Sequence, residues 1–289
     1  MTLPTHAADP GVTMLKRRIP ASKDGEMLPV IGMGTWTTFD VGAGSAERAP
    51  LSEVLKVFHA SGATLIDSSP MYGSSEAVTG DLVQQLGQQA STFYATKVWT
   101  SGRQQGLAQI ERSMRLLKTP RLDLLQIHNL YDWRTHSTTL RALKAEGKIR
   151  YTGVTHYTTG AHADLESVMR AEPFDFAQFN YSIATRAAEQ RLLPFCRERG
   201  IAVLINRPFE EGALFAQVRN RKLPPYAAEL DCTSWAQFFL KFIVSHPAVT
   251  CVIPATSRAT HMQDNVNAGF GTLPDTSLRQ RMVKDFTET

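Results

Sequence analysis

Short apolar runs alternate with segments of helical period along most of this 289-residue chain. The runs occupy 30–36, 63–67, 93–98, 122–128, 149–155, 175–180, 201–206 and 250–254. Several of them, such as "LDLLQIH" at 122–128, carry apolar residues at successive positions, which is typical of parallel strands covered on both faces. Eight strand–helix units within about 250 residues favour the α/β class and a closed (β/α)8 TIM barrel.

A doubly wound open sheet is the competing architecture. It needs a glycine-rich phosphate-binding turn after the first strand, whereas "GMGTW" at 32–36 lacks the G-x-G-x-x-G spacing and opens no helix. No repeat or low-complexity segment indicates a second domain. We therefore predict a single barrel domain over 1–289, with an N-terminal β-hairpin at 14–31 that turns at Lys23, Asp24 and Gly25, and a C-terminal extension at 270–289.

Helix boundaries are marked at several places. Apolar residues fall on one face in 103–118 and in 234–245, and Ser234 followed by Gln237 matches a capping box. Glycines that precede the next strand are common as left-handed C-terminal caps. Those expected to end helices here are Gly62, Gly87, Gly147 and Gly200.

Composition argues against several classes of protein. The net charge is +4, but Lys and Arg are scattered and no aromatic-rich basic block occurs, so nucleic acid is not an expected partner. No run of eighteen apolar residues occurs, so no membrane span is expected. Cys196, Cys232 and Cys251 lie far apart and match no metal-ligand spacing, so we expect neither disulfides nor a metal site, and a reducing compartment fits best.

A basic triplet, Lys16, Arg17 and Arg18, is similar to the start of a twin-arginine export signal. Such a signal requires a hydrophobic stretch next, and "IPASKDG" follows instead. We predict a solvated strand at this place and a cytoplasmic protein. The alternative is an exported protein whose signal was removed upstream.

Polar residues stand at the ends of the predicted strands. Reactive groups in (β/α)8 barrels come from the C-terminal ends of strands. Here those ends carry Asp67, Lys97, His128, Thr155 with His156, Gln178 with Asn180, Asn206 with Arg207, and Thr256. Any one of them alone has a structural explanation, such as a turn cap for Asp67 or a core imidazole for His128. Together they predict a polar surface facing one mouth of the barrel.

Proton transfer is the chemistry that this set can perform. Tyr72 follows Asp67 by five residues, and a phenol with its usual pKa of about 10 is a weak acid at neutral pH. A neighbouring ammonium favours phenolate, and Lys97 can supply that charge with ionised Asp67 as its counter-ion. His128 can hydrogen-bond a substrate oxygen or pass a proton. We therefore expect Asp67 to hold Lys97, and Lys97 to lower the pKa of Tyr72.

At these residues the chain resembles the aldo-keto reductase family, over about residues 28–268. Asp67 at the end of "TLID", Tyr72 in "MYGSSE", Lys97 in "YATKVW" and His128 in "LDLLQIH" match the family's catalytic tetrad in order and in strand placement. The resemblance implies NADPH-dependent reduction of an aldehyde or ketone to an alcohol without a metal. Hydride would come from the nicotinamide and the proton from Tyr72, and some relatives run the reaction in reverse as alcohol dehydrogenases.

The resemblance also implies a set of cofactor-binding residues. Thr155 and His156 stand where relatives have Ser and Asn, and Gln178 matches a Gln that holds the carboxamide. Asn206 and Arg207 stand where relatives place a nicotinamide-stacking aromatic, so that contact departs from the family pattern. The other positions assigned to the cofactor are Thr35, Trp36, Pro208, Thr256, Ser257, Arg258, Asp264 and Asn265.

Cofactor preference rests on one of these segments. Thr256, Ser257 and Arg258 lie at a barrel loop and helix start, where backbone amides and a guanidinium favour a phosphate. Asp264 and Asn265 match positions that meet adenine in relatives. The segment therefore favours NADPH or NADP+ over NADH.

A small-molecule carbonyl or alcohol is the expected partner. Trp36, Met71, Trp99 and Trp133 are predicted to line an aromatic pocket beside Tyr72, suited to an apolar or flat carbonyl compound. The sequence gives no indication of the oligomeric state.

Two other functions are open at this stage. One is an NADP(H)-binding redox-sensing or regulatory subunit with little turnover, and the other is an isomerase or lyase that uses Lys97 as a Schiff base. The intact tetrad favours the reductase, because a sensor could lose Tyr72 or His128 without penalty. Asp67 would also keep the Lys97 amine protonated, which opposes Schiff-base chemistry.

Overall fold

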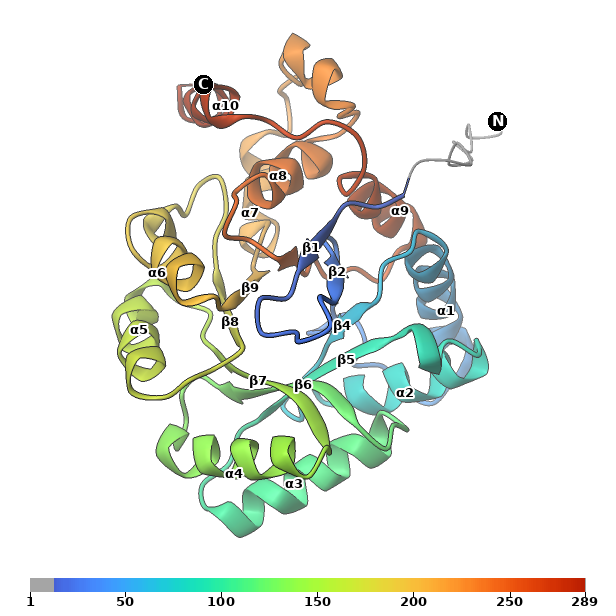
Figure 1. Cartoon of the computed structure of the whole chain (residues 1–289). Coiled ribbons are helices and arrows are strands. Elements are labelled where there is room, and N and C mark those ends of the chain that lie inside the picture. The colour runs from blue at the N-terminus through green and yellow to red at the C-terminus, as the bar shows by residue number, and fades with distance from the viewer. Residues whose placement is uncertain (1–12, 289) are drawn as a thin grey trace.

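Eight parallel strands follow one another in sequence order around the barrel in a computed structural model that describes residues 13–288 (Figure 1). The strands are β3 Met33–Gly34, β4 Leu65–Asp67, β5 Phe93–Val98, β6 Leu122–His128, β7 Ile149–Thr155, β8 Phe176–Asn180, β9 Ala202–Asn206 and β10 Cys251–Val252. Two isolated parallel bridges, Ile31 to Val252 and Gly34 to Ala255, join the last strand to the first. The predicted (β/α)8 barrel is confirmed, and the open-sheet alternative is wrong.

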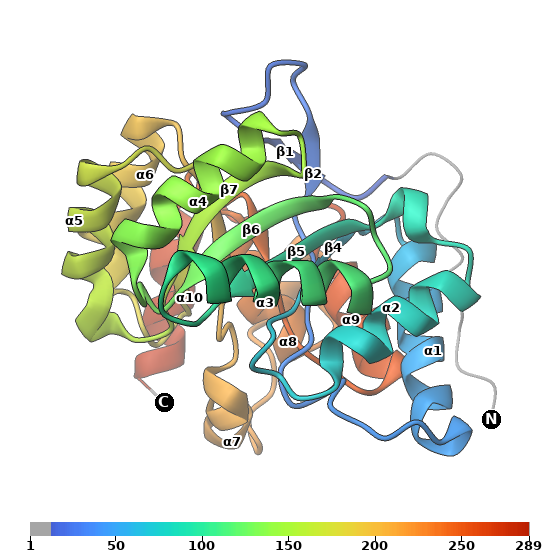
Figure 2. The same ribbon diagram turned by 90° about the horizontal axis from the view of Figure 1, so that it is seen from below.

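Helices surround the barrel on its outside (Figures 1 and 2). They are α1 Ser45–Ala60, α2 Ser75–Gln85, α3 Arg103–Leu116, α4 Trp133–Ala145, α5 His162–Ala171, α6 Leu192–Arg199, α7 Ala213–Gln217, α8 Trp235–Val244 and α9 Ala259–Asn267. The four glycines predicted to end helices all have positive φ, between 65° and 80°. Among residues 13–288, no helix is both long enough and apolar enough to cross a membrane.

The predicted capping box at α8 forms with one change of partner. Ser234 Oγ accepts a hydrogen bond from the Gln237 backbone N–H at 3.1 Å, as expected. The Gln237 side chain, however, accepts from the backbone N–H of Thr233 at 2.8 Å, one residue before the cap. Ser234 is thus the cap and not the first residue of the helix, which begins at Trp235.

The seam where the barrel closes has shorter strands than predicted. The expected runs 30–36 and 250–254 contain only two strand residues each, β3 and β10. The Ile253 N–H still donates to Ile205 O at 3.0 Å, but the next residue is Pro254, which has no N–H to continue the ladder. Closure therefore depends on the two bridges and on loop hydrogen bonds such as Gly34 N–H to Pro254 O at 3.2 Å.

An antiparallel hairpin covers the N-terminal end of the barrel (Figures 1 and 2). It consists of β1 Lys16–Arg18 and β2 Met27–Pro29, with Arg17 paired to Leu28, and confirms the predicted hairpin and solvated strand. Ile19 and Leu28 are fully buried. They belong to the apolar cluster that fills the barrel interior, with Leu65, Phe93, Leu124, Phe176 and Leu204. The hairpin therefore closes this end with side chains.

The C-terminal extension forms one further helix, α10 Thr276–Thr287. Arg279 of α10 donates to the Tyr181 hydroxyl at 2.6 Å and to Ser245 Oγ at 2.6 Å. It also pairs with Glu189 at 2.9 Å. These contacts fasten α10 to the segments that follow β8 and α8.

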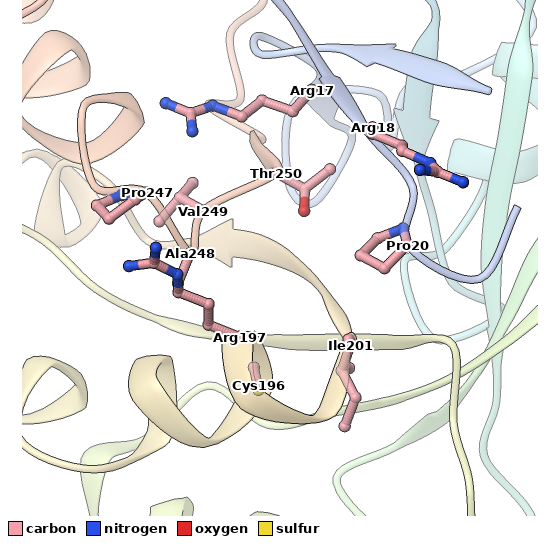
Figure 3. Close-up of a pocket in the computed structure, with 11 residues that line it drawn as sticks. Arg17, Arg18, Pro20, Cys196, Arg197, Ile201, Pro247, Ala248, Val249 and Thr250 are labelled. Carbon is pink, nitrogen blue, oxygen red and sulfur yellow. The ribbon is translucent and has the colours of Figure 1, made fainter. Parts of the chain in front are cut away.

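A pocket beside the hairpin is lined by Arg17, Arg18 and Arg197 (Figure 3). It lies at the end of the barrel opposite to the polar strand ends, because its other walls precede β9 and β10. Arg17 donates to Val244 O at 2.9 Å, at the end of α8, and Arg197 lies in the last turn of α6. Cations are favourable at helix C-termini, and Arg18 points away from the other two guanidinium groups (Figure 3). We therefore assign Arg17 and Arg197 to the helix ends.

Candidate active site

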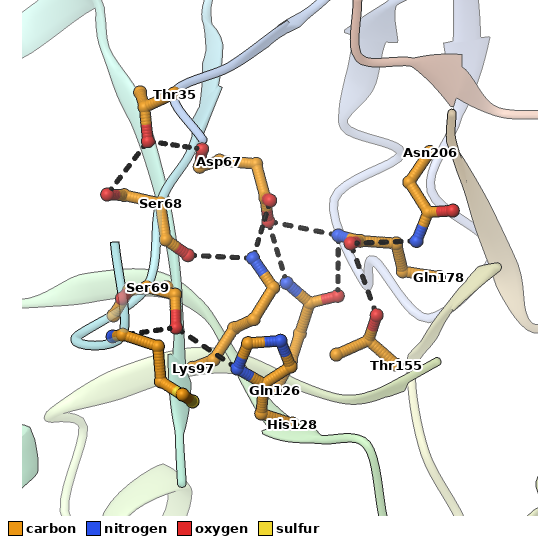
Figure 4. Close-up of polar contacts among 12 residues, drawn as sticks. Thr35, Asp67, Ser68, Ser69, Lys97, Gln126, His128, Thr155, Gln178 and Asn206 are labelled. Carbon is orange, nitrogen blue, oxygen red and sulfur yellow. Dashed lines mark hydrogen bonds and ion pairs between the residues drawn. The ribbon is translucent and has the colours of Figure 1, made fainter. Parts of the chain in front are cut away.

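Three strands direct side chains at the carboxylate of Asp67, the last residue of β4 (Figure 4). Lys97 Nζ donates to Oδ2 at 2.5 Å, while Gln126 Nε2 and Gln178 Nε2 donate to Oδ1 at 2.9 and 3.0 Å. These donors belong to β5, β6 and β8. The polar strand ends therefore converge on one buried carboxylate, which is 2% exposed.

Lys97 is completely buried and also donates to Ser68 O at 2.7 Å. Burial is the largest influence on the pKa of Lys97 and lowers it, but Asp67 and Tyr72 together outweigh burial, so the pKa is raised. The side chain is therefore an ammonium, with Asp67 compensating the cost of placing a charge inside the protein. A protonated amine is not a nucleophile, and the Schiff-base alternative has no support from this geometry.

Tyr72 lies in the turn after β4, and its ring meets both Lys97 and His128. Lys97 Nζ is 5.0 Å from the centre of the ring, and the His128 ring packs edge-on at 5.9 Å between centroids. Burial raises the pKa of Tyr72 more than Lys97 lowers it. The expectation that Lys97 lowers this pKa is thus right for the direction of its influence and wrong for the net shift, and the phenol is protonated at neutral pH.

His128 ends β6, and its imidazole is neutral. Burial, then the Lys97 charge and His156, lower the pKa of His128 to about 3. Its Nδ1 lies 3.1 Å from Ser69 Oγ (Figure 4). A neutral imidazole has one N–H and one acceptor nitrogen. It can therefore donate one hydrogen bond to a substrate oxygen without carrying a charge.

Gln178, predicted to hold a cofactor carboxamide, is fully engaged by the protein. Besides Asp67, its Nε2 donates to Gln126 Oε1 at 3.1 Å. Its Oε1 accepts from Thr155 Oγ1 at 3.1 Å and from Asn206 Nδ2 at 3.3 Å. Two donors and two acceptor sites are all that an amide offers. Gln178 and Thr155 thus act in this structure as supports for Asp67.

Asn206 and His156 keep polar atoms available at the same end of the barrel. Asn206 Nδ2 donates to His156 O at 3.1 Å, while its buried Oδ1 has no hydrogen-bond partner within 13–288. His156 Nδ1 accepts from the Tyr157 N–H at 3.0 Å, so its hydrogen lies on Nε2. Burial lowers the pKa of His156. The site thus offers a free amide oxygen and a neutral imidazole N–H.

Arg207 follows Asn206 in an unusual backbone conformation, with φ of 51°. Its guanidinium carbon is 5.8 Å from the centre of the Tyr157 ring, and Nη2 is 3.3 Å from Glu211 Oε1. The buried Nε has no partner among the described residues. Pro208, the next residue, is buried.

In the segment predicted to bind adenosine, some side chains are exposed and others are buried or hydrogen-bonded within the protein. Thr256 is buried and its Oγ1 accepts from the Arg258 N–H at 3.1 Å, at the start of α9. Ser257 and Arg258 are exposed. Asp264 accepts a hydrogen bond from Gln237 at 2.6 Å, and Asn265 is buried. Ser257 and Arg258 are therefore the members with side chains open to a ligand.

Aromatic and other apolar side chains are exposed around the C-terminal end of the barrel. Seven large apolar residues are exposed within 13–288, and six follow strand ends: Trp36, Met71, Trp99, Tyr131, Tyr157 and Phe215. The rings of Trp99 and Tyr131 lie 5.7 Å apart. Trp133 differs from the other predicted pocket residues, because it is half-buried against the main core and Arg134 covers its ring at 4.5 Å. Thr35 was predicted to contact the cofactor at this end of the barrel, but it is fully buried and donates to Ser68 Oγ at 3.0 Å.

Several residues of this site were not identified from the sequence. Gln126 stands two positions before His128, so alternation along the strand places both on one face, and that spacing was a usable signal. Ser69 had no such signal, since its contact with His128 depends on the turn after β4. Tyr131 and Tyr157 follow strand ends, as the predicted tryptophans do.

Side chains that commonly ligate metals do not gather within residues 13–288. No cluster of three or more His, Cys, Asp or Glu side chains there could hold a metal ion. Cys196, Cys232 and Cys251 are buried free thiols.

Comparison with known proteins agrees with the fold. A model of the aldo/keto reductase family matches residues 30–281. Methylglyoxal reductase YeaE of Escherichia coli is 29% identical over 245 residues, covering 82% of this chain and 84% of that protein. The NADH-specific methylglyoxal reductase of the same organism is 28% identical, covering 72% of each chain.

A solved structure has the same fold. The aldo-keto reductase of Klebsiella pneumoniae in complex with NADPH superimposes with a TM-score of 0.77 at 23% identity, covering 94% of this chain and 96% of that one. The family model spans most of the sequence, and the four residues that suggested the family lie together at the C-terminal ends of the strands. This chain therefore belongs to the aldo/keto reductase family, whose members are oxidoreductases acting on carbonyl and alcohol groups.

Proposed function

We propose that this protein reduces an aldehyde or ketone to an alcohol with NADPH, using Asp67, Tyr72, Lys97 and His128. The observation that carries the proposal is a protonated phenol beside a buried ammonium and a neutral imidazole. Acid catalysis of carbonyl reduction needs this combination, because negative charge develops on the carbonyl oxygen and must be met by a proton and by hydrogen-bond donors.

Each residue has one part in the proposed reaction. The bound cofactor would supply hydride to the carbonyl carbon. The Tyr72 hydroxyl transfers its proton to the carbonyl oxygen, and His128 donates a hydrogen bond to that oxygen. Lys97 stabilises the phenolate that remains on Tyr72, and Asp67 holds the ammonium in place. Because Tyr72 is protonated at neutral pH, the free site already holds the proton that the reduction requires.

The residues present fit a nicotinamide cofactor. The buried, unpartnered Oδ1 of Asn206 suits the amide hydrogens of a carboxamide, and the His156 Nε2–H suits its oxygen. Trp36, Arg207 and Pro208 complete the nicotinamide side of the proposed cofactor set. Thr35, Thr155 and Gln178 belong to that side as supports, because their polar atoms are bonded within the protein. Thr256, Ser257, Arg258, Asp264 and Asn265 complete the adenosine side.

Arg258 is the proposed contact for the additional phosphate of NADPH, since it is exposed at the start of α9. Arg258→Ala should weaken NADPH binding about tenfold or more and leave NADH binding almost unchanged, measured by quenching of tryptophan fluorescence. Arg18→Ala, exposed at the opposite end of the barrel, is the control and should change neither affinity. Equal losses for both cofactors in Arg258→Ala would remove Arg258 from this role.

The proposed substrate is an apolar or flat carbonyl compound that contacts Trp36, Met71, Trp99 and Trp133. Exposed aromatic side chains at this end of the barrel support that choice. Two relatives are methylglyoxal reductases, so a panel should contain methylglyoxal together with aromatic and polycyclic carbonyls. Consumption of NADPH across the panel would rank the classes.

Tyr72→Phe tests the central proposal. It should lower turnover by more than about a hundredfold while NADPH binding changes little, because only the transferable proton is removed. Tyr94→Phe removes a hydroxyl near the start of β5, away from the strand ends that carry the site, and should retain turnover. Full activity of Tyr72→Phe would refute the assigned acid. Tight NADPH binding without turnover by the unmodified protein on any carbonyl would instead favour the redox-sensing alternative.

A further inference from the structure

Ser69, in the turn between β4 and Tyr72, is fully buried against His128. Its Oγ lies 3.1 Å from His128 Nδ1 (Figure 4). The same oxygen accepts a hydrogen bond from the Met71 backbone N–H at 3.2 Å. The two contacts place the hydroxyl between the Tyr72 turn and the imidazole.

The hydrogen of the Ser69 hydroxyl has one available acceptor. A serine hydroxyl has one hydrogen and two lone pairs, and Met71 N–H occupies one lone pair. Among residues 13–288, His128 Nδ1 is the only other polar atom hydrogen-bonded to Ser69 Oγ. If Nδ1 carried a hydrogen and donated to Ser69, the buried serine hydrogen would have no acceptor, which is unfavourable. Ser69 therefore donates to Nδ1.

Other groups around His128 do not determine which nitrogen carries its hydrogen. The Tyr72 ring packs edge-on against the imidazole, and Lys97 and His156 act on it through space. Lys97 directs its Nζ at Asp67 and Ser68. His128 Nε2 makes no hydrogen bond to any described residue. Ser69 is thus the contact that distinguishes the two ring nitrogens.

We propose that Ser69 is a positioning residue that keeps the hydrogen of His128 on Nε2, so that Nε2–H is the donor to the carbonyl oxygen. The consequence for turnover rests on the reduction proposed above. In the other tautomer, Nε2 would present a lone pair to an oxygen on which negative charge is developing, and the two would repel.

Nuclear magnetic resonance of protein labelled with ¹⁵N-histidine tests the tautomer without any substrate. Long-range ¹H–¹⁵N correlations distinguish a protonated ring nitrogen from an unprotonated one, and His128→Gln identifies the His128 signals by their loss. We expect hydrogen on Nε2 in the unmodified protein and in Ser69→Thr, which keeps the hydroxyl. Ser69→Ala should show a mixture of tautomers. Hydrogen on Nδ1 in the unmodified protein would overturn the proposal.

Kinetics supplies the second measurement. Ser69→Ala should lower kcat for carbonyl reduction about tenfold with little change in the KM for NADPH, and Ser69→Thr should restore most of the loss. Ser75→Ala is the matched control, because Ser75 is equally buried nearby but bonds to Thr35 O at 3.3 Å. An unchanged kcat and an unchanged tautomer in Ser69→Ala would refute the role of Ser69 and leave the reductase intact. If the protein reduced no carbonyl at all, the tautomer measurement would still decide the assignment.

Discussion

Two residues with opposed electrostatic requirements share one site. Tyr72 is kept protonated by burial, whereas Lys97 next to it favours phenolate. The balance leaves a phenol that holds its proton until charge develops on a nearby oxygen, when the ammonium stabilises the phenolate that forms. Sequence spacing identified the partners, but the net pKa shift depends on how deeply the turn is buried, which spacing does not show.

Replacing Lys97 tests this balance. In Lys97→Met the pKa of Tyr72 should rise further, because the influence that lowers it is removed and burial remains. A proton donor is lost as the pH rises through its pKa, so the alkaline decline of kcat/KM for reduction should move to higher pH. The rate below that decline should fall by about a hundredfold or more.

A second variant separates this effect from simple destabilisation. Lys97→Met leaves the buried Asp67 carboxylate without its cation, which costs several kcal/mol of stability in typical proteins. Asp67→Asn combined with Lys97→Met removes the unpaired charge and should recover stability without recovering activity. An alkaline decline at the same or lower pH in both variants would contradict the assigned influence of Lys97.

At the scale of elements, the turn that carries Tyr72 is fastened to the loop between β3 and α1. Asp40 accepts hydrogen bonds from the Ser74 N–H at 2.8 Å and from the Ser74 hydroxyl at 2.9 Å. Gly73, between Tyr72 and Ser74, has φ of 57°, and a Cβ there would lie 2.2 Å from Asp40 Oδ1. The loop with Trp36 and the turn with Tyr72 therefore depend on a glycine at position 73.

Three glycine variants separate close packing from backbone conformation. Gly73→Ala should lose about 2 kcal/mol or more of stability, from the left-handed φ together with displacement of Asp40, and kcat should fall. Gly147→Ala has φ of 74° and open space, so it should lose about 1 kcal/mol with no effect on kcat. Gly160→Ala has open space and an ordinary φ and should be nearly neutral. Urea unfolding and turnover measure both effects. Equal losses of stability and equal kcat in Gly73→Ala and Gly147→Ala would show that the contact with Asp40 contributes to neither.

Elements differ in how far they could be predicted from the sequence. The bounds of β5, β6 and β7 agree with the predicted runs, each of which contains several apolar residues and has a polar residue at or next to its C-terminal end. β3 and β10 are shorter because their pairing depends on where the ring closes and on Pro254. The tetrad could be placed because strand ends in a barrel face one side. The Ser69–His128 contact could not be predicted, since it depends on the backbone path of the turn after β4.

At the scale of the whole molecule, buried histidines make stability depend on pH. Burial lowers the pKa of His59 and His246 to about 4 and is the main cause of the value of about 3 for His128. An unfolded histidine titrates near pH 6.5. As the pH falls below that value, the unfolded chain binds protons that the native state does not, so the free energy of unfolding decreases. Glu76 and Asp123, whose pKa values burial raises, act in the opposite direction at lower pH.

His59 offers a direct test, because both of its ring nitrogens are buried without a partner within 13–288. His59→Leu should flatten the decline of unfolding free energy between about pH 7.5 and about pH 5.5 by roughly 1 kcal/mol, allowing for partial solvent screening. His261→Leu, at an exposed histidine, should leave the decline unchanged. Urea titrations at three pH values suffice. The same slope in His59→Leu and the unmodified protein would exclude His59 as a contributor.

The seam between β3 and β10 has a consequence for the order of assembly during synthesis. The bridges from Ile31 to Val252 and from Gly34 to Ala255 join the beginning of the chain to its last strand. While β10 is still inside the ribosome, the nascent chain can already bring Asp67, Lys97, Gln126 and Gln178 together. Its β3 and β9 strands, however, remain unpaired edges of the sheet. Such edges pair readily with other chains. The interval before the final strand leaves the ribosome is therefore when this protein is most open to aggregation and to recognition by chaperones.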